Sequence, residues 1–131
     1  MTNTDKINSL PLSRERMLRA KVSYTPRHAN LESAAVLLTG DIKPKAGDLV
    51  LARIEKIGQH AALELTTGRR SSLFPGDEIV VCYGNRYAPD QYEAEVPDNL
   101  EACHLVAAGG IAAHALSWHV NMKPPTAIVP I

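Results

Sequence analysis

The clearest pattern along the chain is a run of short segments in which hydrophobic and polar residues alternate. Strands are predicted at 49–57 (LVLARIEKI), 61–67 (AALELTT), 69–74 (RRSSLF) and 78–84 (EIVVCYG). Turns that contain Gly, Asp or Pro separate them, and a spacing of about ten residues is typical of an antiparallel meander or small barrel. One more strand is predicted at 92–96 (YEAEV).

The first 40 residues have a weaker pattern. Residues 1–15 are polar and show no periodicity, so we expect a flexible lead-in. The segment 16–25 (RMLRAKVSYT) alternates well enough to predict a strand that ends at Pro26. Residues 30–39 (NLESAAVLLT) fit either a short helix or a buried strand, and we expect a short helix or turn that leads into a strand.

The last third of the chain changes character. Residues 103–108 (CHLVAA) predict a strand, and Gly109-Gly110 a hinge. Over 111–120 (IAAHALSWHV), apolar residues recur at helical spacing and predict a helix, with Ile111, Ala115, Trp118 and Met122 on one stripe. Residues 126–131 (TAIVPI) begin a strand that stops without a polar tail, so we expect a chain trimmed from a longer protein.

These patterns together predict a mainly β domain over residues 16–131. Its expected architecture is a small antiparallel barrel or twisted sheet with one C-terminal helix packed against it. Aromatic residues are scarce, so the core must be built mainly from aliphatic side chains. The expected core residues are Val50, Ile54, Leu63, Leu65, Ile79, Val81, Leu105 and Trp118.

Charge argues against nucleic acid as a partner. Fourteen basic and fourteen acidic side chains cancel over the 131 residues. Residues 1–30 carry six basic and two acidic side chains, which could form a basic arm, but we interpret them as a solvated terminus. No secretory signal and no apolar run of membrane-spanning length is visible, so we expect a cytoplasmic, bacterial-type protein with reduced cysteines that does not bind membranes.

Cysteine and histidine residues suggest metal or nucleophile chemistry, but their spacing does not favour it. His114 and His119 are five residues apart on the predicted helix, about 140° apart in projection, so they cannot easily share one metal ion. Cys82 and Cys103 have no clear activating partner in the sequence. We therefore expect no metal, no cofactor and no catalytic residue, although a small enzyme with a Cys/His site stays an alternative.

The densest group of polar residues lies at 84–92 (GNRYAPDQY), and we interpret it as a binding loop. Arg86 can hold a carboxylate or phosphate, and tyrosines are frequent in binding sites. Gly109-Gly110, between a predicted strand and a predicted helix, could present backbone N–H groups to an anion. The predicted ligand-binding residues are Asn85, Arg86, Tyr87, Asp90, Gln91, Tyr92, Gly109 and Gly110. The expected function is a non-enzymatic accessory or recognition module that binds a small anionic molecule or a partner domain.

Two resemblances extend this interpretation. Residues 47–81 resemble a small barrel of the OB type, which implies single-stranded nucleic-acid binding through Arg69 and Arg70 as an alternative function. The stretches GDLVLAR, LFPGDEIVVCYGNRYAPDQYEAEVP, CHLVAAGGIAAH and MKPPT together resemble the β-rich N-terminal part of uncharacterised bacterial proteins in which a P-loop ATP-binding domain follows. That resemblance implies a partner protein or downstream domain that would hold the nucleotide.

Overall fold

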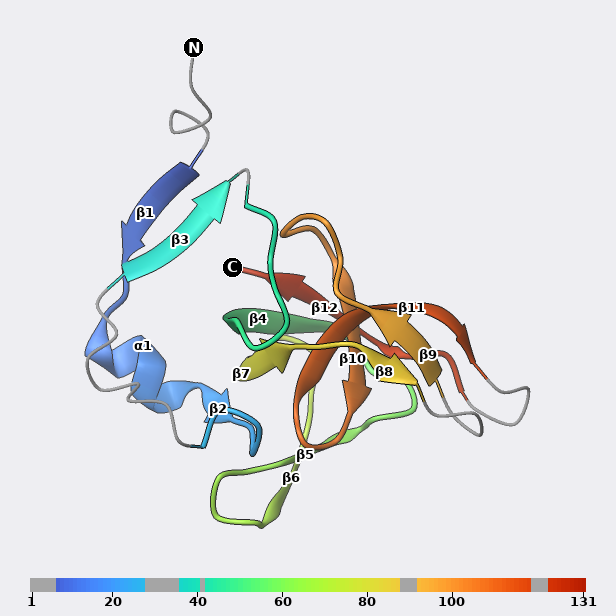
Figure 1. Ribbon diagram of the computed structural model, residues 1–131. Coiled ribbons are helices and arrows are strands. Elements are labelled where there is room, and N and C mark those ends of the chain that lie inside the picture. Colours follow the sequence, from blue (N-terminus) through green and yellow to red (C-terminus); the bar gives the residue numbers. More distant parts are fainter. Residues whose placement is uncertain (1–6, 28–35, 41, 88–91, 119–122) are drawn as a thin grey trace.

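A computed structural model describes residues 7–27, 36–40, 42–87, 92–118 and 123–131 (Figure 1). The chain is mainly β, as predicted, and in the described residues its helical content is one short helix. The elements are β1 (Ile7–Pro11), α1 (Arg14–Arg19), β2 (Lys21–Val22), β3 (Val36–Gly40), β4 (Leu49–Lys56), β5 (Ala62–Glu64), β6 (Arg70–Ser72), β7 (Glu78–Tyr83), β8 (Arg86–Tyr87), β9 (Tyr92–Glu95), β10 (Cys103–Ala107), β11 (Ile111–Trp118) and β12 (Thr126–Pro130).

Five strands close into a barrel. Following the hydrogen bonds, β7 pairs with β4, β4 with β12, β12 with β10, β10 with β11, and β11 returns to β7. Four of these pairs are antiparallel, but β11 runs parallel to β7. The prediction of an antiparallel barrel is thus wrong for this one pair, which closes the ring. Strand β9 also pairs with β11, and β8 pairs with β9, so these two strands extend the sheet beyond the barrel.

Alternation along the strands separates the inside of the barrel from its outside, because successive side chains of a strand point to opposite faces. The core includes Val50, Ala52 and Ile54 of β4. Arg53 and Glu55 of the same strand are exposed. The expected core is confirmed for Val50, Ile54, Leu63, Ile79, Val81 and Leu105, and Leu65 packs against it while partly buried.

The predicted C-terminal helix is wrong, because residues 111–118 form β11. The segment is rich in alanine, and its apolar stripe fits a helix by spacing alone. The segment forms a strand because its backbone pairs with β10, β7 and β9. Trp118, expected in the core, is 43% exposed at the end of this strand. Residues 119–122, the rest of the predicted helix and its stripe, lie outside the described residues.

The N-terminal region differs from the predicted strand at 16–25. Ser13 caps α1 by accepting a hydrogen bond from the Arg16 backbone N–H at 3.1 Å, so the chain turns helical before it reaches β2. Residues 7–11 of the expected lead-in pair with β3 as a two-stranded ribbon, which lies apart from the barrel in Figure 1. β3 also gives the strand expected within 30–39, whereas residues 28–35 lie outside the described part.

Two ion pairs join this N-terminal region to the barrel. Arg16 contacts both carboxylate oxygens of Glu78 at 2.8 and 2.9 Å, and Lys21 Nζ lies 2.8 Å from the Asp77 carboxylate. In the part of the chain that the structure describes, no helix has the length and apolar character needed to cross a membrane.

Candidate functional site

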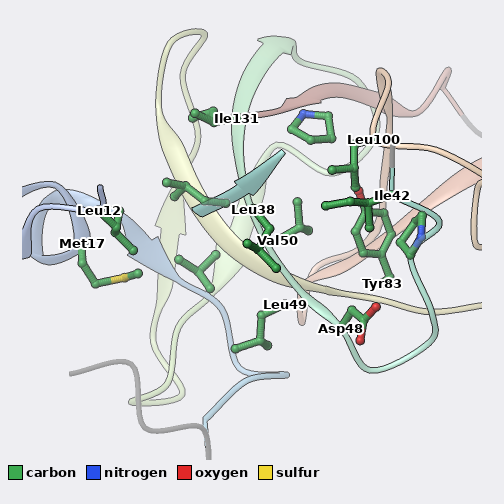
Figure 2. Close-up of a pocket in the computed structure, with 14 residues that line it drawn as sticks. Leu12, Met17, Leu38, Ile42, Asp48, Leu49, Val50, Tyr83, Leu100 and Ile131 are labelled. Atoms are coloured by element: carbon green, nitrogen blue, oxygen red, sulfur yellow. The ribbon is translucent and has the colours of Figure 1, made fainter. Parts of the chain in front are cut away.

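An apolar pocket of about 410 Å³ opens at one end of the barrel, where β4 begins and where β7 and β12 end. The N-terminal region supplies further walls from α1, from β3 and from the segments next to them, and Leu100, between β9 and β10, adds another. Figure 2 shows Leu12 and Met17 at one side of the pocket, with Tyr83, Ile42 and Leu100 at the other. The site is therefore made by residues from distant parts of the sequence.

The lining of the pocket is almost entirely hydrophobic. Tyr83 and Asp48 are its two residues with polar side chains, and among the described residues that line it there is no lysine, arginine or histidine. The full set is Leu12, Met17, Leu38, Ile42, Pro44, Asp48, Leu49, Val50, Leu51, Val80, Tyr83, Leu100, Pro130 and Ile131. A volume of a few hundred Å³ with few polar groups is typical of small-molecule pockets.

Tyr83 is fixed firmly at this end of the barrel. Its backbone N–H donates to the Asp48 carbonyl, and its carbonyl accepts from the Gly47 N–H, both at 2.8 Å. The residue is only 2% exposed, and its ring belongs to the barrel core together with Cys103. Its hydroxyl oxygen is buried and has no hydrogen-bond partner among the residues that the structure describes. Buried hydroxyls normally find a partner, so this one is a polar group of unusual cost in the core.

The Tyr83 hydroxyl stays protonated. Burial raises the pKa of Tyr83 far above its ordinary value of 10, and the nearby Cys103 thiol and Asp48 carboxylate raise it further. A neutral phenol can both donate and accept a hydrogen bond. The Tyr83 hydroxyl is thus an uncharged group within the barrel core.

Asp48 sits at the exposed rim of the pocket. Its carboxylate accepts a hydrogen bond from the Lys45 backbone N–H at 2.8 Å, which closes the turn before β4. Lys43 and Lys45 flank Pro44 in sequence, but both are exposed and neither lines the pocket. Among the described residues that line the pocket, the one charged side chain is therefore negative.

The predicted loop 84–92 is described only in part. The Asn85 side-chain oxygen accepts from the Val96 N–H at 2.8 Å, so this residue holds the hairpin of β8 and β9. Arg86 is partly buried and pairs through its backbone with Ala94. Tyr87 pairs with Glu93 and Tyr92 with Trp118 through the backbone, and Asp90 and Gln91 lie outside the described residues.

Gly109-Gly110 forms the hairpin turn between β10 and β11, so the predicted helix start that would favour an anion does not exist there. The Gly110 carbonyl accepts from Thr25 Oγ1 at 2.7 Å, and the Gly109 carbonyl accepts from the Thr25 N–H at 3.0 Å. A Cβ atom at Gly110 would collide with Ser23. These contacts give the glycines a structural role.

The described residues of the predicted binding site lie along one strand, β11. The loop at 84–92 begins beside the glycine turn, because the Gly84 N–H donates to the Ala112 carbonyl at 3.1 Å. Its last residue, Tyr92, pairs with Trp118 at the far end of β11. Anion binding at the loop stays a prediction.

Of the described cysteine and histidine residues, Cys103 and His104 occupy packed positions in the barrel or its sheet. Cys103 is buried in the barrel core, and burial raises the pKa of its thiol to about 11, which disfavours the nucleophilic thiolate. His104 accepts a hydrogen bond from the Ala115 N–H at 3.1 Å and stacks near His114, with ring centres 5.6 Å apart. Within the described ranges no group of three or more His, Cys, Asp or Glu could hold a metal ion, and His119 lies outside them.

No protein-family model, no curated protein and no solved structure matches this chain. No local motif in the sequence predicts the pocket, although one signal for it is present. Tyr83 shares the interior register of Ile79 and Val81, and a tyrosine among interior aliphatic residues brings a hydroxyl that needs a partner.

Proposed function

We propose that this chain is a non-enzymatic recognition module that binds a small apolar molecule in the pocket beside Tyr83. One observation carries the proposal: a pocket of about 410 Å³ is lined, among the described residues, by hydrophobic side chains except at Tyr83 and Asp48. A small apolar molecule that fills such a pocket leaves few polar groups unpaired.

The surrounding leucines support the same proposal. Leu38 and Leu49 line the pocket and are 58% and 42% exposed, so their side chains have apolar surface that a ligand would remove from water. Burial of such surface contributes about 25 cal/mol per Å². The pocket also has firm walls, because Leu12, Leu51 and Val80 pack together in one buried cluster.

The test is direct binding of 1-octanol to the 131-residue chain, measured by isothermal titration calorimetry and by chemical-shift changes of the pocket methyl groups. Leu49→Trp should narrow the pocket while leaving the fold intact, because Leu49 is partly exposed, and we expect the affinity to fall at least about tenfold. Leu116→Trp is the matched control, since Leu116 is 52% exposed on β11 and does not line the pocket. Failure of octanol to bind, or equal losses in both variants, would contradict the proposal.

A further inference from the structure

We propose that the pocket prefers ligands in which an apolar body carries one positively charged group, as in a primary alkylammonium ion, with the charge placed at the rim beside Asp48. This inference rests on the proposed function and adds the chemical class of the ligand. It also separates this pocket from the loop at 84–92, for which the sequence predicts an anion.

The charge on the lining of the pocket has one sign. Among the described lining residues Asp48 is the one with a charged side chain, and none of them is a lysine, arginine or histidine. A cationic head group at this rim is attracted to the carboxylate, whereas an anionic one is repelled by it. A ligand whose tail lies among the aliphatic side chains therefore binds more tightly when its head is positive.

The Asp48 carboxylate is held in a position that can accept such a group. One of its oxygens, Oδ2, accepts a hydrogen bond from the Lys45 backbone N–H at 2.8 Å, which fixes the side chain in the turn before β4. Within the described ranges, the ion pairs of the protein do not include Asp48. A carboxylate can accept several hydrogen bonds, so Asp48 can accept one from an ammonium group without losing the contact with Lys45.

The exposure of Asp48 sets the strength of this contact. Asp48 is exposed at the rim, so an ammonium group beside it keeps most of its water and avoids the large desolvation cost of a buried ion pair. For the same reason the attraction is modest, because exposed ion pairs change an equilibrium by at most about fivefold. Attraction of a cation and repulsion of an anion together give a preference of roughly fivefold to tenfold.

Two lysines near Asp48 in the sequence do not reverse this preference. Lys43 and Lys45 are exposed, and neither lines the pocket. Lys43 Nζ lies 3.8 Å from the Asp98 carboxylate, which offsets its charge. Lys45 contacts Asp48 through its backbone N–H. An anionic head group in the pocket therefore has no counter-ion among the described lining residues.

The lining places the tail of the ligand as well as its head. Leu49 follows Asp48 directly in the chain and is 42% exposed. Figure 2 shows Leu49 beside Asp48, with Met17 and Leu12 farther away at the other side of the pocket. At about 30 Å³ per carbon, the liquid volume of a water molecule, an eight-carbon chain takes about 240 Å³. Such a chain fits a pocket of about 410 Å³ with its head at Asp48 and its tail toward Met17.

The experiment compares octylammonium, 1-octanol and octanoate, which share one alkyl chain and differ in the charge of the head group. Calorimetry at pH 7 and low salt on the 131-residue chain gives their affinities. We expect octylammonium to bind roughly fivefold to tenfold more tightly than octanoate, with 1-octanol between them. High salt should reduce the ratio of the octylammonium and octanoate affinities to about twofold or less, because ions screen charges at an exposed rim.

Asp48→Asn tests the charged contact itself. Asparagine keeps an acceptor for the Lys45 N–H while removing the charge, so the ratio of the octylammonium and octanoate affinities should fall to about twofold or less. The matched control is Glu55→Gln, which changes the net charge equally. Glu55 is exposed and lies about 20 Å farther along the extended strand β4, beyond the range of screened charges, so the ratio should not change. Thermal melts confirm that each variant is folded.

The outcomes separate the ligand class from the binding function. If 1-octanol binds but octanoate binds as tightly as octylammonium or more tightly, the ligand class is overturned while the binding function stands. The same conclusion follows if Asp48→Asn leaves the ratio unchanged, or if Glu55→Gln lowers it equally. If none of the three ligands binds, the proposed function itself fails.

Discussion

Tyr83 combines a packing role with a buried polar group. Its ring belongs to the barrel core, and its hydroxyl has no hydrogen-bond partner in the described part of the chain. Its interior position follows from the alternation with Ile79 and Val81, which is visible in the sequence. Its missing partner is not visible there, because it depends on every side chain that surrounds the hydroxyl after folding.

Without a ligand, the Tyr83 hydroxyl should cost stability. Tyr83→Phe removes a buried polar group that makes no hydrogen bond, so the free energy of unfolding of the ligand-free protein should stay equal or rise by up to about 1 kcal/mol. Urea denaturation measures it, with Tyr24→Phe as the exposed control. A loss of more than about 1 kcal/mol would mean that the hydroxyl has a structural partner.

His60 gives a test of the environment of Arg86. Burial lowers the pKa of His60 below its ordinary value of 6.5, and the positive charge of Arg86 lowers it further. Arg86→Gln should therefore raise the His60 pKa, whereas Arg69→Gln, at an exposed arginine, should not change it. Titration of the imidazole proton signals by NMR measures both, and a His60 pKa that does not change in Arg86→Gln would contradict this placement of the charge.

The lowered pKa of His60 also predicts how the free energy of unfolding depends on pH. The native His60 binds its proton less readily than the unfolded chain does, and burial lowers the pKa of His104 in the same direction. Between the native and the unfolded pKa values, the unfolded state binds more protons, so the free energy of unfolding should fall as the pH drops below about 6.5. Urea denaturation at pH 7.5 and pH 5.5 measures this change, and an unchanged or higher stability at pH 5.5 would contradict it.

At the scale of elements, alternation was a good guide where it was strict and a poor one where alanine replaced larger residues. The strands predicted at 49–57 and 78–84 match β4 and β7 almost to the residue. The helix predicted at 111–120 was wrong, because alanines fit either a helix or a strand. The strands that pair with β11 come from distant parts of the chain. The local pattern contained too little information to decide.

The turn that precedes β11 requires glycine at position 110, and the loss of stability caused by a side chain there can be measured. Gly110 has a φ of 101°, and a side chain there would also collide with Ser23. Gly76 has a φ of 95° with nothing within 4 Å of an added Cβ, so it isolates the cost of the backbone conformation. We expect Gly76→Ala to lower the free energy of unfolding by about 1–2 kcal/mol and Gly110→Ala by clearly more. Chemical denaturation compares them, and equal costs would contradict the packing at Ser23.

At the scale of the whole molecule, the pocket exists only because the barrel closes and the N-terminal region packs against its end. Met17, Leu38, Tyr83, Leu100 and Ile131 meet there from five separate parts of the sequence. No local motif encodes such a site, whereas the polar loop at 84–92 is visible in the sequence. A partner protein or downstream domain stays a prediction based on resemblance, as does the nucleic-acid alternative.

Intermolecular NOEs between 1-octanol and the labelled protein locate the ligand and so test the proposed binding site. We expect NOEs from the octanol chain to Met17, Leu38 and Leu49, which line the pocket. NOEs only to side chains outside the pocket, such as Leu116, would contradict the proposed site.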